Sequence, residues 1–215
     1  MKMKKILLSI CLVFMTLVVY AQNKTYFVSP NGNDNASGLS IQAAWKSLEK
    51  VNNVTFLPGD KILFESGAVW KGQLKLQGSG EKGNPILLSC YGGEAKPIIN
   101  IGDAEGAGIR LNNQSWWIIE NMEVTSGAAP ELGIGRQGVV ALAQGENQQV
   151  EHIIIRNCYI HDIWGQLGGN TEYTGYNSCA ILVQIQNKRG GINNNRMNTT
   201  LNDVLILSLI HISEP

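Results

Sequence analysis

The chain has 215 residues, of which 44% are hydrophobic and 16% are charged, and its formal net charge is zero. With 24 glycines, this composition is typical of a globular, loop-rich protein rather than of a disordered one. Lys and Arg do not cluster into a basic stripe, so composition gives no support for a nucleic-acid partner. The length suits one domain or a piece of a larger one.

The N-terminus has the pattern of a secretory signal peptide. Three early lysines precede an apolar run from Ile6 to Val19, and Val19-Tyr20-Ala21 provides a cleavage motif. A membrane-spanning helix needs about 20 apolar residues, more than this run supplies. We expect residues 1–21 to be removed and the remainder to be secreted, periplasmic or displayed at the cell surface, without membrane contact.

The mature chain is expected to begin with one strand and one helix. Thr25–Val28 has strand composition and ends at Ser29-Pro30. Residues 41–51 place apolar side chains at helical spacing, with Ser40 as the N-cap. Because strands follow, we expect this amphipathic helix to cap the N-terminal end of a stack of strands.

The next segments all have strand character. Residues 69–76 largely alternate apolar and polar side chains and are expected to form one half-buried strand. Further strands are expected at residues 61–65, 85–89, 97–100, 108–111, 139–142 and 180–183. Since only one helix is evident, the sequence disfavours alternating strand–helix units.

One phrase occurs twice. The segment 117–124 returns as 153–160, and each copy is an apolar run followed by a charged residue and an Asn, at Asn121 and Asn157. Self-similarity of this kind predicts a solenoid of stacked strands. Asn tolerates the left-handed conformation that a tight corner requires, so both Asn residues are expected at corners, bonded to one another between layers.

A third copy starts at residue 202 and then stops. Residues 202–206 align with residues 151–155, but Leu207 and Ser208 follow where a polar residue and an Asn are expected. Residues 207–215 resemble a translated sequencing-library adapter and are expected to be non-native. A genuine terminal strand is the alternative. We therefore expect residues 22–206 to be the N-terminal part of a longer solenoid domain, truncated at its C-terminus.

Several motifs resemble the opening of secreted right-handed parallel β-helix proteins of the pectate-lyase-like superfamily, of the type found in Bacteroidota. They are Tyr26–Asp34, Ser37-Gly38, Ala44–Leu48, Pro58–Phe64, Gly83–Ile86, Tyr91-Gly92 and Lys96–Ile99. The resemblance implies an all-β fold and a carbohydrate-active protein that acts on a polysaccharide, either a polysaccharide lyase or a glycoside hydrolase. A non-catalytic glycan-binding or surface protein is the alternative, because one fold supports many functions.

The resemblance also implies that the catalytic residues lie on middle layers of the solenoid. The present chain is then expected to be inactive, and its full-length parent to be a monomer. No cofactor is evident in the sequence, although the superfamily's lyases can use Ca²⁺, so the full-length parent could require it.

The local candidates for a site are few. His161 and Asp162 could form an acid/base pair, although a turn in which Asp162 bonds the backbone is the favoured interpretation. In later polar segments, Tyr173 and Tyr176 could stack on sugars. Lys188-Arg189 could meet a uronate carboxylate, although a solvated charge pair is the favoured interpretation.

Other motifs have simpler structural explanations. Asn31–Asn35 could hold Ca²⁺, but an Asx-rich turn is favoured, and no metal site is predicted. Trp116-Trp117 could also stack on sugars, yet burial at a strand start is favoured. Cys158 lies within the repeated phrase and is expected to be a small apolar residue of the stack.

Overall fold

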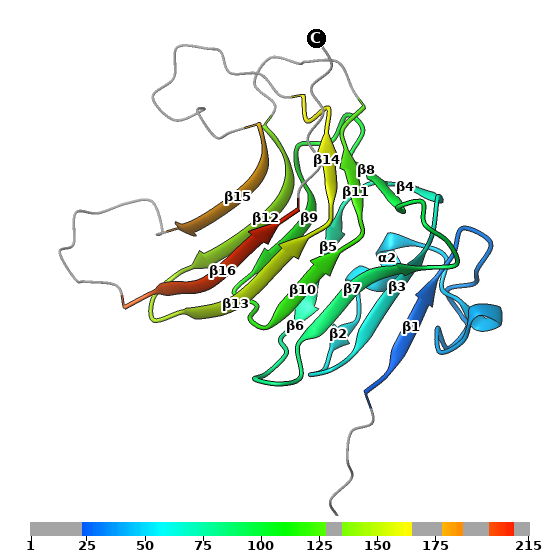
Figure 1. The fold of residues 1–215 in the computed structure, drawn as a ribbon, viewed down its shortest axis with the longest axis horizontal. Coiled ribbons are helices and arrows are strands. Elements are labelled where there is room, and N and C mark those ends of the chain that lie inside the picture. The colour runs from blue at the N-terminus through cyan, green and yellow to red at the C-terminus, as the bar shows by residue number, and fades with distance from the viewer. Residues whose placement is uncertain (1–22, 128–134, 165–177, 187–197, 209–215) are drawn as a thin grey trace, which may run out of the picture.

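The computed structural model describes residues 23–127, 135–164, 178–186 and 198–208 (Figure 1). Within these residues nearly all regular structure is β, and the named strands pair in parallel in three larger sheets and one small one. Sheet 1 contains β1 (Thr25–Val28), β3 (Lys61–Glu65), β7 (Ile86–Tyr91), β10 (Trp117–Glu120), β13 (Gln149–Arg156) and β16 (Thr200–Leu207), in that order.

Sheets 2 and 3 each have four strands. Sheet 2 contains β4 (Val69–Lys71), β8 (Ile98–Asn100), β11 (Glu123–Thr125) and β14 (Tyr159–His161). Sheet 3 contains β5 (Leu74–Lys75), β9 (Gly106–Asn112), β12 (Arg136–Gln144) and β15 (Cys179–Gln186). The small sheet pairs β2 (Thr55–Phe56) with β6 (Gln77–Gly78).

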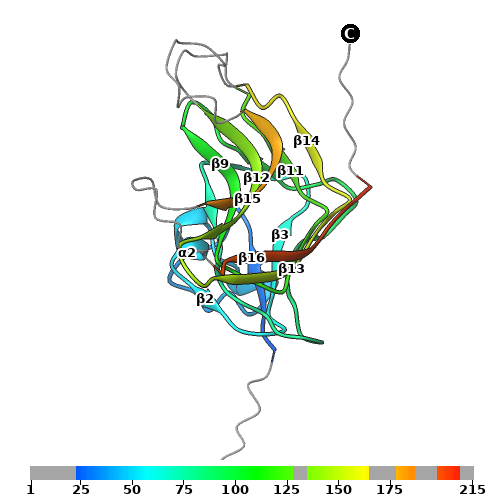
Figure 2. The same cartoon turned by 90° about the vertical axis from the view of Figure 1, so that its left-hand side faces the viewer.

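The chain passes through sheets 1, 2 and 3 in turn and then returns to sheet 1 beside its previous strand. Each such circuit is a rung, for example β10, β11 and β12 followed by β13, β14 and β15. Figures 1 and 2 show the strands of each sheet side by side around a common interior. The architecture is therefore β-helix-like, as expected from the repeated phrase.

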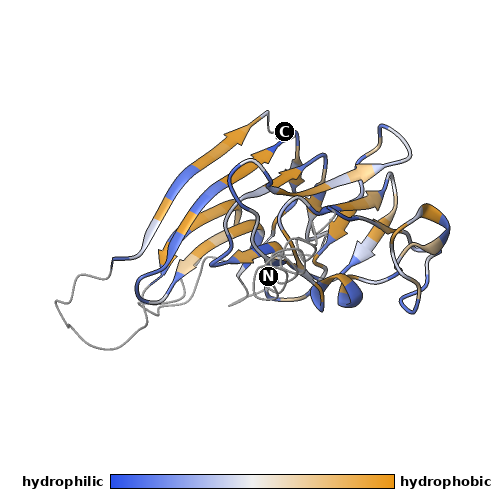
Figure 3. Cartoon of the chain, turned by 90° about the horizontal axis from the view of Figure 1, so that it is seen from below, coloured by the Kyte–Doolittle hydropathy of each residue, from blue (hydrophilic) through white to orange (hydrophobic). Residues whose placement is uncertain are grey.

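The core consists of columns of apolar side chains that face this interior. In sheet 1, Ile62, Leu88, Ile119 and Ile155 pair in register on successive strands, and all four are 0% exposed. The next residue of the column, Ile206, is 41% exposed. Apolar stretches run along the strands while the connections are mostly polar (Figure 3). Burial of these columns is the main stabilising term of the fold.

Both repeated Asn residues lie at the corner between sheets 1 and 2, as predicted. Asn121 and Asn157 are 36 residues apart and have φ values of 57° and 50°. The Asn157 side-chain amide donates to the Asn121 side-chain oxygen, and Asn121 Nδ2 donates to Ser89 Oγ at 3.1 Å. The ladder satisfies polar groups at a corner where most side chains would be strained.

The predicted continuous helix over residues 41–51 is wrong. The segment forms a 3₁₀ turn, η1 (Ile41–Ala43), and a short helix, α2 (Leu48–Asn52). Between them Trp45 forms a parallel bridge to Val28 and stacks on Tyr26, with ring centroids 4.7 Å apart. Burial of an aromatic side chain against strand β1 therefore overrides local helical spacing.

The predicted single strand over residues 69–76 is also wrong. The chain turns at Gly72, where φ is 121°, and passes from β4 in sheet 2 to β5 in sheet 3. Trp70, Leu74 and Leu76 are all buried, because strands on either side of the corner face the same interior. The alternation of apolar side chains continues through the turn, so the sequence pattern does not indicate where the turn is.

The predicted alignment of the third copy matches the observed register. Glu151 pairs with Asn202 and Ile155 with Ile206 in the parallel pair of β13 and β16. Strand β16 continues through Leu207, which pairs with Arg156. Residues 1–21 and 209–215 lie outside the described residues.

Candidate functional site

The candidate site lies on the outer face of sheet 2, where β11 and β14 end. Val124 and Ile160 face the core and are 0% and 3% exposed. Because side chains alternate along a strand, residues on either side of them face outward. Register pairs Glu123 with Tyr159, and Thr125 with His161.

His161 contacts two carboxylates and one aromatic ring, and we name these four residues the His161 cluster. Its Nδ1 lies 2.9 Å from Asp162 Oδ2, and its Nε2 lies 3.1 Å from Glu123 Oε1. Its ring stacks on that of Tyr159, with centroids 4.1 Å apart. The side chains of His161 and Glu123 are 18% and 21% exposed, so solvent reaches both.

This geometry can hold and transfer a proton between an imidazole and either carboxylate. Both ring nitrogens of His161 already have a carboxylate neighbour. A substrate can therefore reach the imidazole only by displacing Glu123 or Asp162. The cluster is equally suited to join β11 to β14 by charge-assisted hydrogen bonds.

Asp162 is a corner residue as well as a partner of His161. Its φ of 47° is left-handed, a conformation that Asp adopts more readily than most residues. Its carbonyl accepts from the backbone amides of Ser126 at 3.3 Å and Trp164 at 3.0 Å. The carboxylate reaches His161 instead of bonding the backbone of the turn. The carbonyl of Asp162 therefore stabilises the turn, while its carboxylate pairs with His161.

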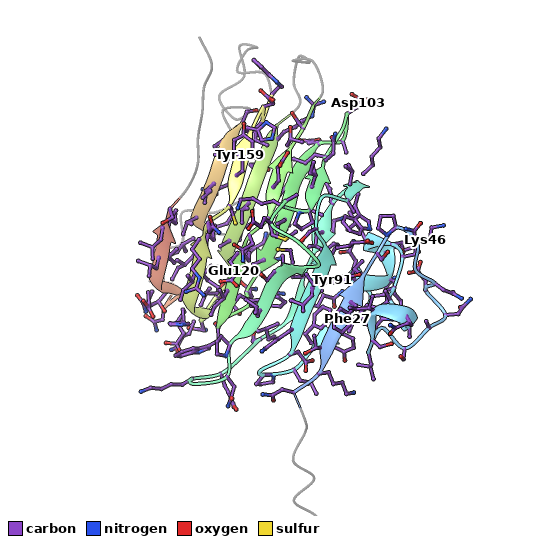
Figure 4. All side chains as sticks on the ribbon, turned by 45° about the vertical axis from the view of Figure 1, so that its right-hand side comes forward. Phe27, Lys46, Tyr91, Asp103, Glu120 and Tyr159 are labelled. Atoms are coloured by element: carbon purple, nitrogen blue, oxygen red, sulfur yellow. The ribbon has the colours of Figure 1, made fainter. Side chains whose placement is uncertain are left out.

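A buried arginine contacts described residues where the chain passes from sheet 2 to sheet 3, a region that we name the 2–3 corner. Arg136, the first residue of β12, is 0% exposed. Its guanidinium donates to the carbonyls of Asp103 at 3.1 Å, Ala104 at 3.2 Å and Trp164 at 2.7 Å. Figure 4 places Asp103 and Tyr159 toward the same end of the molecule, with Glu120 farther down. Sequence reasoning missed Arg136, because an Arg between a polar segment and an apolar strand gives no signal of burial.

The remaining predicted contacts with ligand divide into two groups. Tyr173, Tyr176, Lys188 and Arg189 lie outside the described residues. Trp117 is 0% exposed and its indole donates to the Gly78 carbonyl at 2.9 Å, so the expected burial is confirmed for this residue.

Trp116 is partly exposed and has a different environment from Trp117. Its ring stacks on that of His152, with centroids 4.3 Å apart. His152 Nδ1 in turn lies 2.6 Å from Asp203 Oδ2 on the next rung. These contacts therefore link successive rungs near the start of the sheet 1 strands, just before β10 and within β13 and β16.

The Asn-rich loop near the N-terminus is the expected Asx-rich turn. Asp34 Oδ1 accepts from the amides of Lys46 and Ser47, and Oδ2 accepts from the Ser47 hydroxyl at 2.7 Å. Partial burial tends to raise the pKa of Asp34, but these hydrogen bonds outweigh it and hold the pKa below its usual value. Asn33 Oδ1 likewise accepts from the Asn35 amide.

Neither a metal site nor a membrane span is found in the part of the chain that the structure describes. No group of three or more His, Cys, Asp or Glu side chains there is placed to hold a metal ion. No helix among the same residues has both the length and the apolar character needed to cross a bilayer.

No protein-family model matches the chain. The chain is 27% identical over 204 residues to the lacto-N-biosidase of Bifidobacterium longum subsp. longum, which covers 71% of this chain and 13% of that protein. Among solved structures it is similar to the GH136 lacto-N-biosidase of Eubacterium ramulus. The selenomethionine form aligns with a TM-score of 0.69 and 22% identity, covering 89% of this chain and 35% of that chain.

The native form of the same Eubacterium ramulus enzyme aligns similarly, with a TM-score of 0.67 and 23% identity over 86% of this chain and 34% of that chain. At this level of identity the likeness shows a shared fold. The present chain spans about a third of the length of the solved enzyme, and a smaller part of the curated relative.

Proposed function

We propose that the protein is the N-terminal part of a secreted glycoside hydrolase with a right-handed β-helix of the pectate-lyase-like type. The observation that carries the proposal is that sequence and fold independently point to lacto-N-biosidases. This favours a hydrolase over a lyase and suggests a glycan that contains lacto-N-biose as the substrate class. The N-terminal pattern of residues 1–21 supports secretion.

The catalytic carboxylates are proposed to lie on rungs beyond β16. A glycoside hydrolase needs two carboxyl groups on either side of a glycosidic bond. In the His161 cluster the imidazole occupies the space between the carboxylates of Glu123 and Asp162. A sugar linkage cannot enter that space without displacing His161, so this pair is a poor candidate for the reacting pair.

The exposed last rung supports the proposal that native rungs follow β16. Ile206 and Ile185 occupy core-facing register positions, yet they are 41% and 46% exposed. Their partners Ile155 and Ala143 on the preceding rung are both 0% exposed. A further rung stacked on β15 and β16 would cover them, whereas residues 207–215 are proposed to be non-native.

We also propose that α2 caps the N-terminal end of the stack. It packs against β5, the outermost strand of sheet 3. Asn52 Nδ2 donates to the Gln73 carbonyl at 2.9 Å, and Asn52 Oδ1 accepts from the Lys75 amide at 2.6 Å. The side chain thereby satisfies backbone groups of an otherwise open sheet edge.

The test requires the protein encoded by the uninterrupted native gene. We expect it to release lacto-N-biose from its p-nitrophenyl β-glycoside, with new reducing ends and no absorbance from an unsaturated uronate. Unsaturated products from polyuronates would instead identify a lyase. Binding to glycans without any product would favour the non-catalytic alternative, and EDTA treatment during the assay would test the Ca²⁺ expectation.

A further inference from the structure

Trp164 differs from the other tryptophans of the described chain because it is exposed. It lies three residues after the end of β14 and is 47% exposed, whereas Trp45, Trp70 and Trp117 are at most 5% exposed. Trp116, which stacks on His152, is intermediate. Trp164 is the one aromatic residue among the exposed large hydrophobic residues of the described segments.

The backbone of Trp164 is held firmly on both sides of this exposed ring. Its amide donates to the Asp162 carbonyl and to Ser126 Oγ, each at 3.0 Å. Ile163, the residue between Asp162 and Trp164, packs against the main core. The segment is thus anchored inward at Ile163, while the side chains on both sides of it are exposed.

The carbonyl of Trp164 is fixed by Arg136 from the neighbouring rung. Arg136 Nη1 donates to it at 2.7 Å, while the same guanidinium binds the carbonyls of Asp103 and Ala104 one rung earlier. Removing a guanidinium from water is expensive unless its donors are satisfied. A fully buried Arg at this position therefore ties three successive 2–3 corners together and presents Trp164 on a rigid support.

A hydrogen-bond acceptor, the carboxylate of Asp162, belongs to the same short exposed segment as Trp164, since only Ile163 separates the two residues in the chain. The side chain of Asp162 is 55% exposed, and one of its oxygens contacts His161, which leaves the other available to a ligand. The nearby carboxylate of Glu123 adds to the acidic character of this corner. An exposed indole and an exposed carboxylate on one short segment suit a pyranose ring, which has an apolar C–H face and an edge of hydroxyl donors. The same carboxylates disfavour an anionic uronate.

We propose that Trp164 and Asp162 form a binding subsite for a neutral sugar ring at the 2–3 corner. One face of the ring stacks on the indole, and a hydroxyl donates to the free carboxylate oxygen of Asp162. Arg136 is a positioning residue that holds the support rigid. The inference deepens the proposed function, on which it rests for the choice of a glycan as ligand.

The experiment measures sugar binding to the 215-residue chain and needs no turnover. Lacto-N-biose and a galacturonate oligomer are titrated by calorimetry, and acrylamide quenching of tryptophan fluorescence is recorded with and without sugar. We expect the neutral sugar to bind and to protect part of the fluorescence, and the galacturonate oligomer to bind more weakly. Trp164→Ala should weaken binding about tenfold, and Trp164→Phe should weaken it much less, because an aromatic face remains.

Val69→Ala is the matched control, since Val69 is also exposed, at 50%, and lies on the outer face of sheet 2. It should bind like the unmodified chain. Urea unfolding of each variant separates lost binding from lost folding, and Trp164→Phe settles the result if Trp164→Ala unfolds. The inference is overturned if the unmodified chain binds no neutral sugar, if Trp164→Ala binds normally, or if a folded Trp164→Phe variant loses binding.

Failure of this inference and failure of the proposed function give different results. A native-length enzyme that hydrolyses its glycan with an unchanged KM in Trp164→Ala would overturn the subsite and leave the hydrolase in place. Binding that depends on Trp164 without any turnover in the native-length protein would retain the subsite and reject the hydrolase.

Discussion

Replacing Ile155 with Ala should destabilise the chain much more than the same replacement at Ile206, although the two residues pair on neighbouring strands. Both positions face the interior in the register of β13 and β16. Ile155 is 0% exposed and Ile206 is 41% exposed. The substitution removes three carbon atoms, which corresponds to about 2.4 kcal/mol of transfer free energy when the side chain is fully buried.

At Ile155 the cavity left by the substitution adds to this loss, giving about 3–4 kcal/mol in total. At Ile206 only the buried part of the side chain counts, about 1.4 kcal/mol, and the open side leaves no enclosed cavity. With a urea m-value of about 2 kcal/mol/M, the unfolding midpoints should fall by about 1.5–2 M and about 0.7 M, respectively.

Urea titrations followed by far-UV circular dichroism measure both shifts on the same chain. Because rungs contact only their neighbours, loss of the last rung at low urea should appear as a separate, shallow transition in Ile206→Ala. Equal midpoint shifts, or a larger shift for Ile206→Ala, would refute the reasoning. Such a result would mean that Ile206 is covered as fully as Ile155.

Three further predictions concern buried or constrained residues. Arg136→Met should lower the free energy of unfolding, measured with urea, by about 3 kcal/mol, because three carbonyl acceptors lose their donors. Arg156→Met is the control, and it should lower the same free energy by less than about 1 kcal/mol, because Arg156 belongs to an exposed ion pair. Asn157→Gly should be about 1 kcal/mol more stable than Asn157→Ala in the same assay, since only Gly tolerates the left-handed φ at no penalty. Burial raises the pKa of Cys158 to about 11, so iodoacetamide at pH 8 should leave this thiol unmodified until urea unfolds the chain.

The stacking of strands could be predicted from the sequence because the core imposes a register. Each rung repeats the apolar positions of the previous one, and the alignment of residues 151–155 with residues 202–206 is the alignment observed. The corner at Asn121 and Asn157 was predictable for a related reason, since few residue types tolerate the backbone conformation there.

Corners that lack such a residue are harder to predict from the sequence. At Gly72 the apolar alternation continues from β4 into β5, so periodicity alone predicts one strand where there are two. The prediction of one helix over residues 41–51 is wrong because of a contact outside that segment. Trp45 is buried against Tyr26, which belongs to strand β1. The spacing of apolar residues indicates neither the turn at Gly72 nor the contact of Trp45 with Tyr26.

The candidate site was only partly predictable, because outward-facing residues are not constrained by the core. The sequence makes His161 and Asp162 a candidate pair, because the two residues are adjacent. Glu123 joins them only through the lateral pairing of β11 and β14. Arg136 reaches Asp103 across one rung and Trp164 across another, and no pattern in the sequence indicates either distance.

The 2–3 corner therefore combines two requirements that a solenoid normally separates. The interior needs repetition, which explains why Val124 and Ile160 occupy equivalent positions. A ligand site needs residues that do not repeat, and these can accumulate on the outer faces of strands and where the chain leaves one sheet before it enters the next. A buried Arg136 is compatible with both requirements, because three of its hydrogen bonds go to backbone carbonyls, which every residue supplies. The described residues of this corner can thus vary their exposed side chains, Trp164 among them, while the carbonyls bound by Arg136 keep their hydrogen bonds.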